Sequence, residues 1–261
     1  MKQFNQYIRD LWRRKDLLLY LVTSGLKANT RNTFLGYFWW VLDPLLMVMV
    51  FGFLRVVFLG RSGEHFIAFL AVGLIVFQFF SASLTGSARS ITGQAGIISQ
   101  VYLPKAMFPF GLVLTQLVNF AFGFVTLAVI LAFSRIVPGR EILLLPVIIL
   151  SQLIFHVVIA LIMAYLAAFV RDLERLLGHF TRIMRFTAPV IWEADRIPER
   201  LQWLLDYNPF AWLVMAYRDV LMYGRVPDMS RIINLGLVSL VMAVALIVFY
   251  SYNEHRIIKV L

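Results

Sequence analysis

Long runs of apolar residues, separated by short polar segments, dominate the sequence. Each run is about long enough to cross the ~30 Å apolar core of a bilayer as a helix. The runs cover residues 34–58, 66–87, 107–133, 142–170, 176–192 and 232–252. The fifth run is the weakest, because it carries Arg182 and Arg185. The pattern predicts an all-α integral membrane protein with six transmembrane helices.

The segment before the first run has a helical period instead. Within residues 3–15, Tyr7, Ile8, Leu11 and Trp12 lie on one face and arginines on the others. This arrangement is typical of an interfacial helix on a membrane surface; a soluble helix packing on a partner is the alternative. We expect a cytoplasmic N-terminal segment at residues 1–33, a transmembrane domain at 34–252 and a cytoplasmic tail at 253–261.

The stretch at residues 193–231 is ambiguous, because its apolar part, residues 209–223, is short of the ~20 residues that a crossing helix needs. We interpret the stretch either as an external re-entrant segment at about 193–230 or as a seventh crossing. Lys and Arg favour the cytoplasmic side. Six spans with the N-terminus inside put the whole net charge of +10 in the cytoplasm, whereas a seventh would move Arg256 and Lys259 outside. We therefore predict six spans with both termini cytoplasmic.

Composition supports the membrane class. Hydrophobic residues make up 61% of the chain and charged residues 15%, against roughly 25% charged in soluble domains. There is no cysteine, and the four histidines are scattered, so we expect no metal site. The basic charge suits an inner leaflet of anionic membrane lipids, and we expect no nucleic-acid partner.

Motifs of enzymes are missing from the sequence. It contains no Gly-Lys dipeptide, which excludes a P-loop, and neither G-x-S-x-G nor H-E-x-x-H. Glu193, Asp195 and Glu199 could serve acid–base chemistry, although a solvated loop is the simpler interpretation. We predict that the chain has no catalytic residues, binds no cofactor and is not an enzyme.

Polar residues inside the spans are costly in lipid and so mark protein, water or substrate contacts. The uncharged or acidic members of this group are Asp43, Gln116, Asn119, Gln152 and His156. For the three amides and the histidine, interhelical hydrogen bonding is the simplest role. Arg182 and Arg185 could meet a phosphate group or extend to the inner interface. Aromatic residues at the span ends could form a headgroup belt or stack on sugars.

The loop between the second and third runs holds a short apolar segment, Gly96–Tyr102, closed by Pro104. Such a segment is too short to be stable alone in water. We expect it to dock on another protein through residues that form one continuous stretch: Gly96, Ile97, Ile98, Ser99, Gln100, Val101 and Tyr102.

Five motifs occur in a characteristic order: LGYFWWVLDP at 35–44, SQVYLPKAMFP at 99–109, RDLERLL at 171–177, PVIW at 189–192 and NPFAWLVMAYRDVL at 208–221. Together they resemble the type 2 ATP-binding-cassette (ABC) exporter permeases, in the branch that exports O-antigen, capsule and teichoic acid. The resemblance covers nearly the whole chain. One departure is Leu103, where many relatives have Phe before the proline; this concerns packing of the docking segment.

The resemblance implies a homodimer with two copies of a separate ATPase, which binds ATP and magnesium. A coupling helix would lie at about 96–102, with Arg171 and Asp172 beside the ATPase. The first and fifth spans of both copies would line a channel in the bacterial cytoplasmic membrane.

The implied substrate is an undecaprenyl-diphosphate-linked polysaccharide. We expect its path to involve aromatic and cationic side chains: Tyr37, Phe38, Trp40, Phe77, Phe80, Arg182 and Arg185. Three alternatives remain: a permease of the same fold for a drug or small lipid, a membrane enzyme of lipid-linked sugar metabolism, and a structural membrane anchor.

Overall fold

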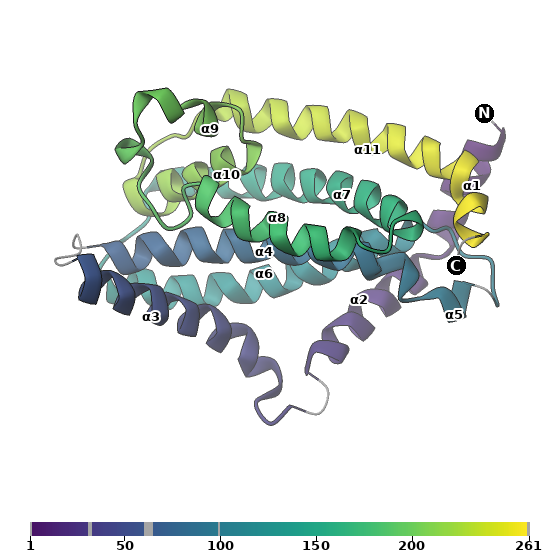
Figure 1. Ribbon diagram of the computed structural model, residues 1–261, viewed down its shortest axis with the longest axis horizontal. Coiled ribbons are helices and arrows are strands. Elements are labelled where there is room, and N and C mark those ends of the chain that lie inside the picture. The colour runs from purple at the N-terminus through teal and green to yellow at the C-terminus, as the bar shows by residue number, and fades with distance from the viewer. Residues whose placement is uncertain (1, 31–32, 60–64, 99, 260–261) are drawn as a thin grey trace.

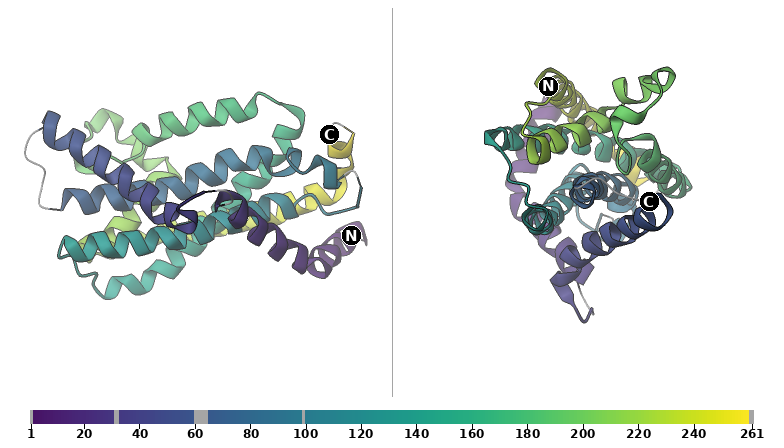
Figure 2. Two further views of the ribbon diagram at one scale, coloured as in Figure 1. Left: turned by 90° about the horizontal axis from the view of Figure 1, so that it is seen from below. Right: turned by 90° about the vertical axis from the view of Figure 1, so that its left-hand side faces the viewer.

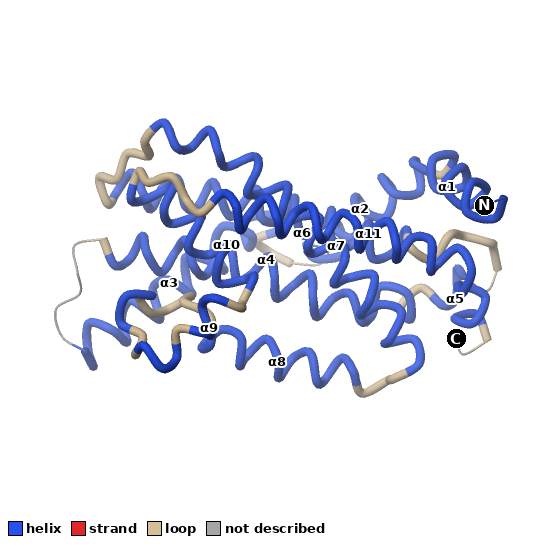
Figure 3. Tube along the Cα trace, turned by 90° about the horizontal axis from the view of Figure 1, so that it is seen from above, coloured by secondary structure: helices blue, strands red, loops and turns tan. Residues whose placement is uncertain are grey.

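The computed structural model of the protein describes residues 2–30, 33–59, 65–98 and 100–259, and every regular element within them is helical (Figure 3). In chain order these are α1 (Lys2–Arg13), α2 (Lys15–Thr30), η1 (Gly36–Phe38), α3 (Trp39–Leu59), α4 (Phe66–Thr92), α5 (Ala95–Ile98), α6 (Met107–Phe133), η2 (Arg140–Leu144), α7 (Leu145–Phe169), α8 (Leu173–Thr187), η3 (Ala194–Arg196), η4 (Glu199–Leu201), α9 (Trp203–Asp206), α10 (Pro209–Arg218), the π-helical turn η5 (Asp219–Tyr223) and α11 (Met229–Ile258).

The long helices run side by side along the long axis of the molecule (Figure 1). Helix α4 is apolar on all sides and is the most buried, packed against α3, α6, α7, α8 and α10. Among the described residues, four helices are long and apolar enough to cross a membrane: α4, α6, α11 and the continuous helix Arg140–Phe169. The apolar stretch of α3, Trp39–Leu54, is shorter.

The fifth apolar run ends earlier than the hydrophobic pattern predicts. Helix α8 stops at Thr187, and residues 188–192 form a turn. Pro189 has no backbone N–H and restricts the residue before it, so it cannot continue the helix. The prediction of a single run over residues 176–192 was therefore wrong at its end.

Helix α10 is short, yet it is buried inside one end of the bundle, against α4, α7 and α11. Its start is well defined: the Asn208 side chain accepts a hydrogen bond from the Phe210 N–H at 3.0 Å, and Pro209 follows as the first helical residue. The π-helical turn ends at Gly224, whose φ of +57° favours glycine.

Helices α1 and α5 and the end of α11 lie at the opposite end of the bundle, and α2 runs from there toward the middle (Figure 1). Figure 2 shows both chain ends on that side. The first described residues of α1 and the last of α11 therefore lie at the same end. The hydrophobic pattern missed α2, which packs against α6. A second buried cluster joins α1 and the residues after α5 to the ends of the long helices; its members include Tyr7, Ile98, Leu103, Phe108, Leu161 and Tyr250.

Candidate functional site

Helix α3 leans on α4 and diverges from the bundle toward its own beginning (Figure 1). A pocket opens on each side of it. The amide pocket, about 480 Å³, lies between α3, α4 and α6, and the arginine pocket, about 430 Å³, lies between α3, α4 and α8. Asp43, Gln78 and Ala82 line both, so the two pockets adjoin beneath α3.

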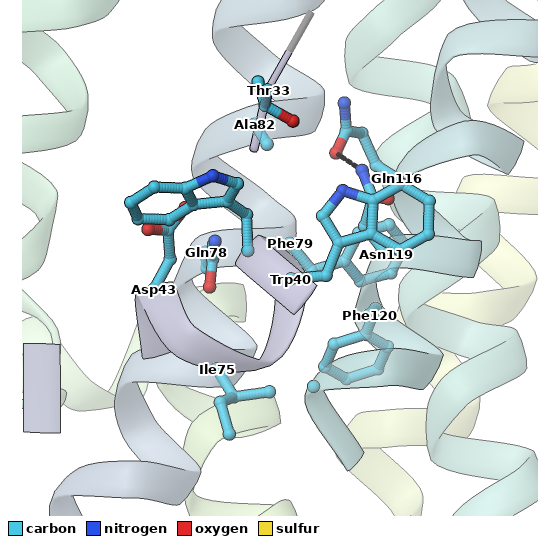
Figure 4. A pocket seen from close by; sticks show the side chains of 12 residues that line it. Thr33, Trp40, Asp43, Ile75, Gln78, Phe79, Ala82, Gln116, Asn119 and Phe120 are labelled. Carbon is cyan, nitrogen blue, oxygen red and sulfur yellow. Dashed lines mark hydrogen bonds between the residues drawn. The ribbon is translucent and has the colours of Figure 1, made fainter. Parts of the chain in front are cut away.

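The amide pocket gathers polar side chains from three helices. Asp43 and Gln78 lie on one side, and Gln116 and Asn119 on the other (Figure 4). The Asn119 side-chain N–H donates to Gln116 Oε1 at 2.9 Å. Both residues belong to α6, so this bond lies within one helix, and the interhelical bond predicted for these two amides is not observed among the described residues. The remaining lining residues are Thr33, Trp39, Trp40, Ile75, Phe79, Ala82, Phe120 and Gly123.

The arginine pocket is mostly apolar and takes its name from Arg185 on α8. The Arg185 guanidinium carbon lies 4.8 Å from the centre of the Phe77 ring. The Arg185 Nε atom is buried and has no hydrogen-bond partner among the described residues. Arg182, one turn earlier, is exposed and is not among the residues that line the pocket. The predicted arginine pair is therefore divided, with one member inside and one outside.

The aromatic residues at the start of α3 differ in position. Trp40 lines the amide pocket and packs against Phe122, with ring centres 4.8 Å apart. Phe38 is exposed and lines neither pocket. The side chain of Tyr37 lies outside the part of the chain that the structure describes.

Phe77 and Phe80 are core residues, with 2% and 3% of their surface exposed. Phe77 borders the arginine pocket, but Phe80 lines neither pocket and stacks on Phe210 of α10 at a ring separation of 4.5 Å. The expectation that Phe80 meets sugar or lipid has no support in this arrangement. The reason is the insertion of α10, which covers this face of α4.

The polar residues of α7 are buried in different ways. Gln152 Oε1 accepts a hydrogen bond from the Tyr217 hydroxyl at 2.6 Å, as expected of an interhelical bond. His156 instead packs edge-on against Phe79, with ring centres 4.3 Å apart, and neither ring nitrogen has a hydrogen-bond partner among the described residues. Both residues lie in the core and line neither pocket.

Sequence reasoning missed Arg218 at the end of α10. Its side chain is 3% exposed and donates hydrogen bonds to the main-chain carbonyls of Pro189, Val190 (2.7 Å) and Phe69 (3.3 Å). Gly73 leaves room for it, because a Cβ atom there would collide with the Val190 carbonyl oxygen and the guanidinium. The sequence did contain an indication of this role, since Arg218 is a charged residue inside the apolar stretch 209–223.

The docking segment is shorter than predicted. Helix α5 covers only Ala95–Ile98, and Ser99 lies outside the described residues. Ile98 is 5% exposed and packs into the second buried cluster, so the prediction that it contacts a partner was wrong. Ile97 and Val101 are 46% and 53% exposed, while Gly96 and Gln100 also reach the surface.

A hydrogen-bonded cluster fixes the docking segment to α11. The Tyr102 hydroxyl donates to Glu254 Oε1 at 2.6 Å, and the main-chain N–H of Lys105 donates to Glu254 Oε2 at 3.1 Å. Burial, reinforced by the hydrogen bond to Glu254, raises the pKa of Tyr102. Burial also lowers the pKa of Lys105, whose ammonium nitrogen lies 4.7 Å from the centre of the Tyr102 ring.

The turn between α7 and α8 lies at the same end and exposes Arg171 and Asp172, as a contact surface requires. Arg89 near the end of α4 forms a 2.6 Å ion pair with Glu174 at the start of α8. This pair links the helix that leads into the docking segment to the helix that carries Arg185.

The acidic residues considered for catalysis lie together in one stretch of the chain. Glu193, Asp195 and Glu199 follow α8 in the loop before α9, where Asp195 and Glu199 are exposed. Within the described ranges, no group of three His, Cys, Asp or Glu side chains could hold a metal ion.

Comparison with known proteins places this architecture in a family. The sequence profile of the ABC-2 type transporters matches residues 16–222. An O-antigen export system permease protein RfbA of Myxococcus xanthus is 30% identical over 252 residues, 95% of this chain and 96% of the relative. A protein of the same name from Klebsiella pneumoniae is 30% identical over 210 residues, 80% of this chain and 81% of the relative. The chain therefore belongs to the ABC-2 type transporter family.

Proposed function

We propose that this chain is the membrane-spanning permease subunit of an exporter that moves a lipid-linked cell-envelope polysaccharide across the bacterial cytoplasmic membrane. The observation that carries the proposal is the similarity, over nearly the full length of both chains, to permeases named for O-antigen export. The arginine pocket supplies a cationic surface for the phosphate of such a substrate.

The proposal counts six membrane crossings, by α3, α4, α6, α7, α8 and α11. Among the described residues, α4, α6, α11 and the helix that contains α7 are long and apolar enough to cross, whereas the apolar stretch of α3 and the whole of α8 are shorter. An even number of crossings agrees with the beginning of α1 and the end of α11 lying at one end (Figure 2). That end carries α5 and the exposed Arg171, and is the cytoplasmic end by the excess of positive charge. Helix α10 then enters the bundle from the outer side, and the chain returns to that side without crossing. Such a re-entrant segment is tolerated at membrane depth when it is buried in protein.

The arginine pocket is suited to the phosphate end of the substrate. A guanidinium can form bidentate, charge-assisted hydrogen bonds to phosphate oxygens. Arg185 stands in a pocket whose remaining lining is largely apolar, which suits the junction between a diphosphate and a lipid chain. The substrate class we propose is an undecaprenyl-diphosphate-linked polymer such as O-antigen, capsule or teichoic acid.

A second copy of the chain completes the path in this proposal. Exposed apolar residues run along α8 at helical spacing. Others lie on α3, where Met47 and Val50 line the arginine pocket and Phe53 lies beyond it. Two protomers facing each other through these helices enclose a channel and cover the apolar faces. The residues concerned are Met47, Val50, Phe53, Leu176, Phe180 and Ile183.

Two copies of a separate ATPase supply the energy, since the sequence contains no P-loop. The exposed apolar residues of the docking end, Ile97 and Val101, form the contact. The link from Tyr102 to Glu254 then transmits movement of the docking segment to α11.

Replacing Ile97 and Val101 together by aspartate should weaken ATPase binding about tenfold or more. The change puts two charges where apolar surface is buried, and each tenfold loss corresponds to about 1.4 kcal/mol. Retention of the ATPase during purification of the permease measures the effect. Val137→Asp is the matched control, since Val137 is 88% exposed in the turn after α6 at the other end; normal retention in the double variant would contradict the docking surface.

The proposed function itself is tested in cells. Deleting the gene should remove the polysaccharide from the cell surface and leave the lipid-linked polymer on the cytoplasmic side. Restoring the gene should reverse both effects. A deletion strain with normal surface polysaccharide but impaired efflux of a drug or small lipid would refute the proposal and favour the alternative permease function.

A further inference from the structure

The amide pocket is a concentration of polar groups in helices that are otherwise apolar. Asp43, Gln78, Gln116 and Asn119 converge there from α3, α4 and α6 (Figure 4). Polar side chains at membrane depth are costly unless they face protein, water or a ligand. The pocket therefore offers hydrogen-bonding groups to a polar ligand or to water.

The hydrogen-bonding capacity of the amides is only partly used inside the chain. The pair formed by Asn119 and Gln116 engages one donor and one acceptor. Asn119 Oδ1 is buried and has no hydrogen-bond partner among the described residues. An acceptor buried without a partner is unfavourable, and a ligand donor reaches it only if the Asn119 side chain turns toward the pocket.

Indole rings supply the apolar part of the same pocket. Trp39 and Trp40 line it at the beginning of α3, and Trp40 is held against Phe122. An aromatic face beside amide and carboxylate groups matches a molecule with one apolar face and several hydroxyl groups at its rim. A lipid chain does not use the polar groups. A metal ion lacks ligands, since Asp43 is the one carboxylate among the described residues that line the pocket.

We propose that the amide pocket binds a sugar residue of the exported polymer. This inference rests on the proposed function and names the part of the substrate that this pocket takes. Sugar hydroxyls donate to the Asp43 carboxylate and accept from the amide N–H groups, and the sugar ring packs on an indole. The cavity of about 480 Å³ falls in the size range of small-molecule sites.

The neighbouring arginine pocket gives this assignment a consistent geometry. Asp43 and Gln78 line both pockets, so the two pockets adjoin beneath α3. In a lipid-linked polymer the first sugars are bonded directly to the diphosphate. One substrate molecule can thus place its phosphate at Arg185 and an adjoining sugar among the amides.

The test uses the permease–ATPase complex in lipid nanodiscs and an oligosaccharide cut from the cell's own surface polysaccharide, free of lipid and phosphate. Titration calorimetry measures its binding. The double variant Gln116→Leu/Asn119→Leu, similar in volume but without hydrogen-bonding groups, should bind about tenfold more weakly or worse. Asn234→Leu, the same kind of change at an exposed position on α11, should bind as the wild type does.

Equal affinity in the double variant and the wild type would overturn the assignment. If the double variant does not accumulate, Gln78→Leu replaces it, with the same expectation. A wild-type complex that exports lipid-linked polymer but does not bind the oligosaccharide would overturn the sugar pocket and leave the proposed function intact. A complex that exports no polymer would overturn both.

Discussion

Replacing Arg185 by leucine should reduce polysaccharide export about tenfold to a hundredfold, with a normal amount of permease in the membrane. Arg185 lines the arginine pocket, its guanidinium lies over Phe77, and its Nε atom has no hydrogen-bond partner within the described residues. A hydrogen bond between charged groups contributes roughly 1.5–3 kcal/mol, and about 1.4 kcal/mol corresponds to a tenfold change. Loss of one such contact with the phosphate therefore accounts for a tenfold to hundredfold fall in export.

The measurement is surface polysaccharide per permease molecule in cells that carry each variant. Arg182→Leu is the matched control, because it removes the same charge from the same helix at an exposed position outside the pocket. Arg185→Lys should keep part of the activity, since lysine retains the charge but not the bidentate geometry. Normal export by Arg185→Leu, or an equal loss in Arg182→Leu, would contradict the role assigned to Arg185.

Replacing Arg218 by leucine should lower the free energy of unfolding by about 3 kcal/mol. Arg218 donates to the carbonyls of Pro189 and Val190, and a buried acceptor left without a partner costs roughly 1–3 kcal/mol. The guanidinium also packs on the Phe69 ring at 3.4 Å. For a chain of this size we expect the melting temperature to fall by about 5–10 °C.

Thermal unfolding of the purified permease in detergent measures this effect. Arg225→Leu is the control, since Arg225 is exposed and rests on the Tyr223 ring. The loop between α8 and α10 should also become easier to cleave by protease in the Arg218 variant, because its anchor to α4 is lost. An unchanged melting temperature would show that the three carbonyl contacts do not hold α10 in place.

The long helices were the most predictable part of the fold. The apolar run at residues 107–133 coincides with α6, because apolar length alone determines a helix that is surrounded by lipid and protein. Helix α8 was harder, because its end depends on Pro189 and on the distant contact of residues 189 and 190 with Arg218. Helix α2 was missed because the surface of α6 that it covers cannot be identified from its own sequence.

The site was predictable in kind but not in arrangement. A charged side chain in an apolar run is costly in a membrane and so indicates a functional role. On this ground the sequence identified both Arg182 and Arg185 as candidates. Which one faces a pocket depends on the position of α3. Phe80 was chosen because aromatic residues gather near the end of its span, yet α10 covers it, and that contact joins residues far apart in the sequence.

The central claim is tested most directly with the purified permease and its ATPase in proteoliposomes that contain the lipid-linked polysaccharide. With the ATPase facing outward, added ATP should move polymer from the outer leaflet to the inner one, where an external glycosidase cannot reach it. The protected fraction should grow with ATP and magnesium and remain constant with a non-hydrolysable ATP analogue. ATP hydrolysis that leaves the polymer fully accessible to the glycosidase would contradict the account.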